Sequence, residues 1–401
     1  AVVLAGKTEV PINVITYRAV DEAINITDLT LTYSSSTAST TDFSKVTLWN
    51  GATKIGEAQW AGGSALNATS TFTSPFVVPK DGEKELTIKV DLSPISVTAS
   101  TTAGRLLAID YNGISSSTGS GESSGARLGS GSSSNTAGAS MQLMKSFPTL
   151  EKVAVPSTTL PQTDAKLFRF KVKADAAGPI ALYKFTFNIS SSTVSATTSN
   201  FRLFAYTDSG FSQKKYDNNP INFQNVDCTG MSTFESATAC TSTTAGLTGS
   251  AYASTTGSTL SEVVFFFSPS ANTASTSEAI VIGAGETIYF DMVGDITNPG
   301  SGTGNNFQVS LLGDAARAVR EGNASTMGIG LLGLTGFMDG GKGYLGTAAA
   351  VASQSVNNDF VWSPLSTSTN VTTASSSPDW ANGFLVPGLP STNMSANTFS
   401  N

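Results

Sequence analysis

The two cysteines are the first residues of the chain whose type and spacing could do chemistry. Cys228 and Cys240 lie in one polar stretch, DCTGMSTFESATAC. As a disulfide they would close a loop of about a dozen residues and contribute on the order of 3 kcal/mol by restricting the unfolded chain. This pairing fits an oxidising, extracytoplasmic compartment; the alternative is two thiols in a reducing cytoplasm. A zinc site is not expected, because two sulfurs cannot complete the zinc shell without histidine.

Histidine is absent from all 401 residues. The chain therefore lacks the side chain that most often performs acid–base catalysis near neutral pH and most often binds metals. Ser-His-Asp and Cys-His arrangements and the usual zinc sites are excluded. We expect a protein that is not an enzyme, with no catalytic residue, no metal site and no bound cofactor.

Carboxylates are the other candidate chemical groups. A carboxylate pair can hydrolyse glycosides, and loop carboxylates with backbone carbonyls can hold calcium. The chain has no dense Asp/Asn/Gly spacing of a calcium loop, so calcium is kept only as the alternative to no cofactor. Asp91 and Asp295 follow equivalent predicted strands, and this repetition favours a structural role at turns. Further acidic residues near predicted turns are Asp81, Glu83, Asp217 and Asp339.

One glycine-rich segment comes close to a phosphate-binding loop. In GFMDGGKG (336–343), Gly336, Gly341 and Lys342 match, but Gly343 stands where the magnesium-binding Ser or Thr belongs. That loop also needs a preceding strand and a following helix, which this sequence does not predict. The segment is therefore interpreted as a flexible glycine loop.

Aromatic residues in predicted loops and strand ends offer a second kind of binding site. Trp49, Trp60 and Tyr111 could stack on sugar rings, although packing in a core or interface is the favoured interpretation. N-x-S/T triplets, which are the acceptor pattern for glycosylation, begin at Asn25, Asn67, Asn188, Asn323, Asn370 and Asn393.

Charge and hydropathy limit the kinds of partner that the chain can bind. Charged residues make up 13% of the chain, the net charge is −7, and the sequence has no run of Lys or Arg. These features argue against a nucleic acid or an anionic membrane surface as partner. The most apolar window, MGIGLLGLTGF (327–337), is far shorter than the roughly 20 residues of a membrane span. The chain opens at Ala1 without a basic leader, so export would make this a mature or trimmed chain.

Short runs with apolar residues at every second position dominate the sequence and predict strands. Polar clusters of Ser, Thr, Gly, Asn and Pro separate them, and almost no segment has a sustained period of 3.6. The predicted fold class is all-β, with two tandem immunoglobulin-like β-sandwich domains and an irregular C-terminal extension. Clear strand signals are VPINVITYRAV (10–20), KVTLWN (45–50), ELTIKVDL (85–92), LFRFKVKA (167–174), EVVFFF (262–267) and TIYFDMV (287–293).

The two predicted domains are divergent copies of one unit. With an offset of 156 residues, 4–33 lies over 160–189, which pairs Ile12 with Phe168 and Val14 with Phe170. In both INITDLTLTY (24–33) and IALYKFTFNI (180–189), the apolar positions step by two, then three, then two. A shared irregularity is stronger support for common structure than shared alternation, and it predicts a β-bulge or a break between sheets.

The predicted boundaries follow from this duplication. Residues 1–146 form copy 1, with a Gly/Ser-rich loop at 114–140, and 147–319 form copy 2, with an insertion at about 208–260 that holds the cysteines. Residues 320–401 form a Gly-rich segment and a tail that packs on copy 2 or on a neighbour. The Gly/Ser-rich stretch is expected to be a surface loop that ends in a last strand, MQLMKSF, with a flexible linker as the alternative.

The segments PSTTLPQTDAKLFRFKVKADAAGPIALYKFTFNIS (156–190) and DFVWSPLSTSTNVTTASSSPDWANGFLVPGLPS (359–391) carry a family resemblance. With LWNGATKIGEAQW and FVVPKDGEKELTIKVDL, they make the chain similar to secreted immunoglobulin-like surface proteins of candidate phyla radiation bacteria, Parcubacteria in particular. The resemblance implies an exported cell-envelope protein of the surface-layer type and no catalytic residues. Because family members are often longer, it also implies residues upstream of Ala1.

The expected function is a self-assembling structural subunit of the bacterial cell exterior, either a surface-layer lattice or an extracellular filament. The expected partners are copies of the same chain, with a cell-envelope glycan bound by an adhesin-like surface as the alternative. An unattached terminal strand can add to an open sheet edge of a neighbour. The candidate assembly strands are Val2, Val3 and Leu4 at one end and Phe384, Leu385 and Val386 at the other.

Overall fold

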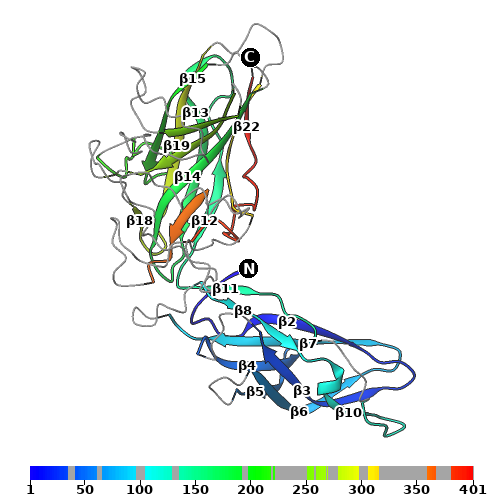
Figure 1. Ribbon diagram of the computed structural model, residues 1–401. Coiled ribbons are helices and arrows are strands. Elements are labelled where there is room, and N and C mark those ends of the chain that lie inside the picture. Colours follow the sequence, from blue (N-terminus) through cyan, green and yellow to red (C-terminus); the bar gives the residue numbers. More distant parts are fainter. Residues whose placement is uncertain are drawn as a thin grey trace. The chain divides into compact units, whose positions relative to one another are not determined.

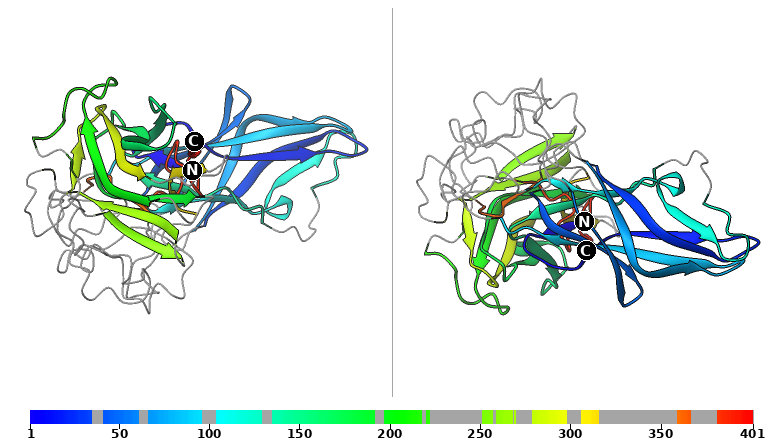
Figure 2. Two further views of the ribbon diagram at one scale, coloured as in Figure 1. Left: turned by 90° about the horizontal axis from the view of Figure 1, so that it is seen from above. Right: turned by 90° about the horizontal axis from the view of Figure 1, so that it is seen from below.

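The computed structural model describes most of two compact units, Ala1–Met144 and Lys145–Asn401. Within the described residues the only helical element is a short 3-10 turn, η2 (Ile114–Ser116), and no helix has the length and apolarity to cross a membrane. Figures 1 and 2 show the strands of the two units. The described residues are 1–34, 41–60, 66–95, 104–128, 135–191, 197–217, 220–221, 251–256, 259–267, 269, 279–297, 306–315, 359–366 and 381–400.

Unit 1 is built from two sheets and a small strand group. One sheet has the order β2-β7-β4-β5; in the other, β3 lies between β10 and β6 and also pairs with β9; the small group has the order β1-β11-β8. The strands are β1 (Val2–Leu4), β2 (Val10–Arg18), β3 (Ile24–Tyr33), β4 (Phe43–Asn50), β5 (Thr53–Ala58), β6 (Asn67–Val78), β7 (Glu83–Leu92), β8 (Leu106–Leu107), β9 (Ile109–Tyr111), β10 (Thr118–Gly121) and β11 (Met141–Met144).

Unit 2 repeats this plan. One sheet has the order β12-β13-β19-β15, and the other has the order β16-β17-β14-β20-β22, with β18 and β21 also paired to β14. The strands are β12 (Pro148–Val153), β13 (Gln162–Ala174), β14 (Ile180–Ser191), β15 (Thr197–Tyr206), β16 (Ala251–Thr256), β17 (Thr259–Phe266), β18 (Ile280–Ile282), β19 (Thr287–Thr297), β20 (Asn306–Leu311), β21 (Phe360–Ser363) and β22 (Asn397–Ser400).

Aromatic contacts between the sheets make each unit a sandwich. In unit 1 the Tyr17 ring on β2 lies edge-on to Phe76 on β6 at 5.7 Å between centroids. In unit 2 the Phe170 ring on β13 lies edge-on to Phe185 on β14 at 5.2 Å. Alternation along each strand directs these apolar side chains inward. The prediction of an all-β fold with two tandem sandwiches is confirmed.

Part of the strand order is that of the immunoglobulin fold. The second strand, β2, pairs with β7, which pairs with β4, while β3 pairs with β9 in the opposite sheet. These strands are divided between the two sheets as the corresponding strands of an immunoglobulin domain are. The first strand β1 runs parallel to the last strand β11, with Val2 opposite Gln142.

The predicted irregularity is present in both copies. In β3 the register with β6 shifts between Ile26 and Asp28, and in β14 the register with β21 shifts between Leu182 and Lys184. The three-residue step in the sequence therefore marks a real irregularity of the ladder, at equivalent positions of the two units. The offset of 156 therefore aligns β3 with β14 correctly.

The same offset is wrong by one residue for β2 and β13. Each of these strands has a bulge, and the residues in the two bulges are Ile12 and Leu167, which are 155 positions apart. The predicted pairing of Val14 with Phe170 fails because Val14 is 50% exposed and Phe170 is fully buried. An offset of 155 pairs Ile15 with Phe170, both buried; a one-residue slip exchanges the two faces of a strand.

The C-terminal residues complete unit 2. Strand β22 pairs antiparallel with β20 and forms a parallel bridge to Thr159, which precedes β13. Unit 1 uses the same arrangement, because β11 pairs with β8 and runs parallel to β1. In the sequence, residues 312–396 separate β20 from β22, as the Gly/Ser-rich segment separates β9 from β11 in unit 1.

Candidate functional site

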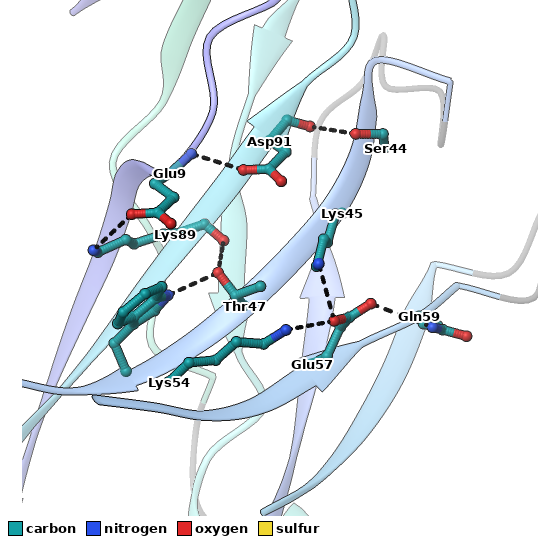
Figure 3. A network of polar contacts seen from close by, with 10 residues as sticks. Glu9, Ser44, Lys45, Thr47, Lys54, Glu57, Gln59, Lys89 and Asp91 are labelled. Carbon is teal, nitrogen blue, oxygen red and sulfur yellow. Dashed lines mark hydrogen bonds and ion pairs between the residues drawn. The ribbon is translucent and has the colours of Figure 1, made fainter. Parts of the chain in front are cut away.

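The outward face of the β2-β7-β4-β5 sheet in unit 1 carries a network of polar contacts, drawn in Figure 3. The carboxylate of Glu57 on β5 accepts hydrogen bonds from Lys54 at 2.7 Å and Gln59 at 3.3 Å, and Lys45 lies 3.4 Å away. The Lys54 hydrogen bond is the main cause that lowers the pKa of Glu57, and Glu57 raises the pKa of Lys54 in return. Lys45 precedes Val46 on β4, and Lys54 precedes Ile55 on β5; Val46 and Ile55 are both buried.

Trp49 lies beside this network and makes contacts with other residues of the chain. Its indole Nε1 donates to Thr47 Oγ1 at 2.8 Å. The Lys89 ammonium lies 3.8 Å from a ring centroid of the indole, and its other partner is Glu9 at 3.5 Å. A cation over an indole at a partly exposed site contributes about 0.5–1 kcal/mol. One face of this ring is thus occupied by the protein's own lysine.

The other two aromatic candidates for sugar binding are also used internally. Trp60 donates from Nε1 to Leu66 O at 2.8 Å, and its ring lies edge-on to Phe43 at 5.1 Å. Tyr111 is only 5% exposed and shares a hydrogen bond of 2.8 Å with Ser117 Oγ. Tyr111 thus belongs to the core, in agreement with the favoured interpretation, and is not available to bind a sugar. The geometry favours packing for all three.

Asp91 and Asp295 form matched carboxylate clasps, one in each unit. Asp91 Oδ1 accepts from the backbone N–H of Glu9 at 2.7 Å, and Asp295 Oδ1 accepts from the backbone N–H of Asp164 at 2.8 Å. Glu9 and Asp164 both have a left-handed backbone, with φ of 53° and 52°. Asp91 therefore fixes the chain where it enters β2, and Asp295 fixes the irregular part of β13, where the register with β19 shifts between Gln162 and Ala165. These hydrogen bonds fit a structural role, but the predicted position at turns is wrong, because both residues lie inside their strands.

Alanine at either clasp position is expected to destabilise its own unit. Asp91→Ala or Asp295→Ala leaves a backbone N–H of a strained residue without its charged acceptor, at a cost of about 1–2 kcal/mol. Asp91→Asn and Asp295→Asn keep an acceptor oxygen and should lose less than half as much. Urea unfolding of the four variants measures this. Equal losses for Ala and Asn would contradict the clasp.

Each unit also contains a buried ion pair that sequence reasoning missed. In unit 1 Asp42 accepts from Tyr33 Oη at 2.9 Å and from Arg105 at 3.1 Å. In unit 2 Asp291 accepts from Arg169 at 2.9 Å; burial raises its pKa and Arg169 opposes this. The sequence feature that could have indicated such a pair is a charged residue between apolar neighbours, as in YFDMV and LFRFKV.

A third buried carboxylate, Asp314, holds the C-terminal residues of unit 2. Its oxygens accept from the backbone N–H groups of Asp359 at 2.9 Å, Phe360 at 3.3 Å and Gly383 at 2.7 Å. Burial raises the pKa of Asp314 to about 7, and the nearby Asp359 carboxylate adds to this rise. Its acceptors are occupied by amides of its own chain, so its role is to position the tail.

The remaining predicted residues are distributed as follows. Val2, Val3 and Leu4 form β1 in the sheet of their own unit. Phe384, Leu385 and Val386 lie in a turn, in which Val386 is buried and Leu385 is 39% exposed. Asp81 Oδ1 accepts from the Asp21 N–H at 3.2 Å and joins two turns, and Glu83 begins β7.

Several predicted features fall outside the described residues. They are Cys228, Cys240, the glycine-rich segment 336–343, Asp339, Asn323 and Asn370. Of the described glycosylation triplets, Asn25 lies in β3 and Asn188 in β14, while Asn67 and Asn393 are exposed. Within the described ranges no three acidic or cysteine side chains gather as metal ligands.

Comparisons with known proteins find only distant likeness. No protein-family model matches the chain, and no curated protein matches it. Among solved structures, the C-terminal domain of the AgI/II polypeptide BspA of Streptococcus agalactiae is 9% identical, over 77% of this chain and 90% of that chain, with a TM-score of 0.18. Collagen adhesin (CNA) from S. aureus is 9% identical, over 77% and 87%, with a TM-score of 0.14.

A third similar structure is the T6 backbone pilin of serotype M6 Streptococcus pyogenes. It is 8% identical, over 73% of this chain and 57% of that chain, with a TM-score of 0.17. Scores this low mean that the whole chains do not superpose, and no functional assignment is drawn from them.

Proposed function

We propose that the chain is a self-assembling structural subunit of the bacterial cell exterior, in a surface-layer lattice or an extracellular filament. The observation that supports this most is the duplication of one sandwich down to its irregular features: the bulge in β3 and β14 and the clasp of Asp91 and Asp295. Two such units in tandem form a repeating design, which suits head-to-tail contacts between copies.

The proposed location is extracellular, at the cell surface. The support is the low content of charged residues, the absence of histidine and the resemblance to secreted surface proteins. The proposed partners are further copies of the chain. A carbohydrate-binding role is not put forward as a second function, because Trp49, Trp60 and Tyr111 each have internal partners.

Electron microscopy of the purified protein tests the proposal. Ordered sheets or fibres are expected under conditions in which the monomer is folded by circular dichroism. Dispersed particles of monomer size at all concentrations would overturn it.

A chain that lacks residues 1–4 tests strand exchange. Because Gln142 N–H donates to Ala1 O at 2.7 Å and Ala5 N–H donates to Met144 O at 2.8 Å, this segment lines the edge of β11. If the shortened chain folded and assembled normally, exchange through β1 would be wrong.

A further inference from the structure

Asn382 and Gly383 lie near the start of the described tail of unit 2 and are held against β21. Trp362 Nε1 donates to the backbone O of Asn382 at 2.8 Å, and Ala381 and Trp362 exchange two backbone hydrogen bonds of 2.7 and 3.0 Å. Asn382 is 3% exposed, and Gly383 is also buried. The position of this Asn-Gly pair is therefore fixed inside unit 2.

The side chain of Asn382 is folded toward the peptide groups that follow it. Its Oδ1 accepts from Phe384 N–H, two residues on, at 3.2 Å, which makes an Asx turn. One bond between Cγ of Asn382 and the backbone nitrogen of Gly383 would close a small ring. The Phe384 N–H lies where it can stabilise negative charge that develops on Oδ1 during such an attack.

The carboxylate of Asp314 is hydrogen-bonded to the nitrogen that would attack. Gly383 N–H donates to Asp314 Oδ2 at 2.7 Å, which is the shortest of the three amide hydrogen bonds that this carboxylate accepts. A general base must lie about 2.6–3.2 Å from the atom whose proton it removes, and Asp314 meets this condition. Burial also raises its pKa to about 7, so its carboxylate binds a proton more strongly than an exposed aspartate does.

Packing around position 383 requires glycine. A Cβ there would lie 2.7 Å from Leu389 Cδ2 and 2.9 Å from Asp314 Oδ2. Both distances are shorter than a Cβ tolerates. The absence of a side chain lets the carboxylate reach the backbone nitrogen and leaves that nitrogen open to react.

We propose that Asn382–Gly383 is a self-modification site, at which Asp314 acts as general base and the backbone closes into a succinimide ring. The nitrogen of Gly383 attacks Cγ of Asn382, and its proton passes to Asp314 Oδ2. The Cγ–Nδ2 bond then breaks, and Asp314 returns the proton to the leaving nitrogen, which departs as ammonia. The chain stays intact, and the reaction consumes no oxidant and no second reactant.

The buried position preserves the ring once it has formed. At an exposed Asn-Gly pair, water opens the succinimide to aspartate or isoaspartate. Asn382 and Gly383 are both buried, and a site closed to water protects a reactive group from hydrolysis. The ring also fixes the backbone between the two residues, which reduces the freedom of the unfolded tail.

Mass spectrometry of the full chain during incubation at mildly alkaline pH tests the proposal. The peptide that contains Asn382–Gly383 should lose the mass of one ammonia molecule, and hydroxylamine at neutral pH should then cleave between these two residues. Asn50–Gly51 and Asn112–Gly113 are internal controls, because neither glycine N–H donates to a carboxylate in the described part of the chain. These two pairs should not accumulate the ring. No loss of ammonia at Asn382–Gly383, or equal accumulation at all three pairs, would overturn the proposal.

Asp314→Asn is the variant that tests the base. Asparagine keeps an acceptor oxygen for the amides of the tail but cannot take up the proton of Gly383. Because a positioned general base typically contributes a factor of about 100 or more, ring formation should slow at least about tenfold. Ring formation at the wild-type rate in this variant would show that Asp314 does not act as the base and would overturn the proposal.

The pH dependence of the wild-type rate protects the test against misfolding of Asp314→Asn. Asp359 is the other carboxylate that acts on Asp314. With Asp314 as the base, the rate should rise until this carboxyl is ionised and level off above its pKa of about 7. A rate that keeps rising in proportion to hydroxide well above that value would assign the reaction to solvent hydroxide and overturn the proposal.

Discussion

Phe185→Ala is expected to destabilise unit 2 by about 3–5 kcal/mol, the cost of removing a large aromatic side chain from a closed core. The Phe185 ring is fully buried at the centre of the sandwich. It lies edge-on to Phe267 at 4.9 Å and Phe290 at 5.1 Å, and stacks on Phe360 at 5.2 Å. Since 1 kcal/mol shifts the Tm of a domain of this size by roughly 2–4 °C, the calorimetric transition of unit 2 should fall by about 6–20 °C.

Leu29→Ala is the matched control in the other unit. Leu29 occupies the position equivalent to Phe185 at the offset of 156 and is fully buried. Its loss should cost about 2–5 kcal/mol and lower only the transition of unit 1. If either variant moved both transitions equally, the two units would not be separate cooperative structures.

The stability of unit 2 is expected to fall as the pH rises from about 4 to above 7, through Asp314. The pKa of this carboxyl is 3.8 ordinarily and about 7 in the folded unit, because burial and the Asp359 carboxylate disfavour the charged form. A group whose folded pKa is raised contributes stability that is complete below pH 4 and is lost as the pH passes the folded value. One pKa unit corresponds to about 1.4 kcal/mol, so the loss is on the order of 4 kcal/mol.

Asp314→Asn is the control for this pH dependence. Asparagine does not titrate, and its side-chain oxygen can still accept from Gly383 and Phe360, so the stability of the variant should change less between pH 4 and 8. Asp314→Ala leaves three buried N–H groups without acceptors and should cost at least about 3 kcal/mol at every pH. Urea unfolding across this pH range gives the comparison. Parallel curves for wild type and Asp314→Asn would refute the assignment.

The class of fold could be predicted because apolar alternation is a local property of the sequence. The step of three in INITDLTLTY and IALYKFTFNI was visible for the same reason, and it marked the irregularity in β3 and β14. The offset for β2 failed because the connection to the next strand is one residue longer in unit 2: Ala174 lies six positions before Ile180, and the equivalent Ala19 lies five positions before Ile24. Val14 and Ile15 have the same character in the sequence, and only one of them faces the core.

Contacts between residues that are far apart in the chain could not be predicted from local sequence patterns. Asp314 and Gly383 are separated by 69 residues along the chain, and no period or spacing connects them. The role of β22 as the last strand of unit 2 was hidden for a related reason, since a four-residue strand with Asn397 and Phe399 inward resembles any polar tail. Asp91 and Asp295 could be identified from the sequence because each copy has an aspartate at the equivalent position.

A parallel contact of the last strand with an earlier segment gives each unit a particular response to tension: β11 pairs with β1 in unit 1, and β22 forms a bridge to Thr159 in unit 2. When parallel neighbours are pulled from the start of one and the end of the other, their hydrogen bonds are loaded together in shear and cannot open one by one. In unit 1 these bonds include Gln142 N–H to Ala1 O and Ala5 N–H to Met144 O; in unit 2 they include Ser400 N–H to Thr158 O and Leu160 N–H to Ser400 O. A chain built this way resists stretching along its own length, and each unit must break its terminal pair before its core is exposed to force.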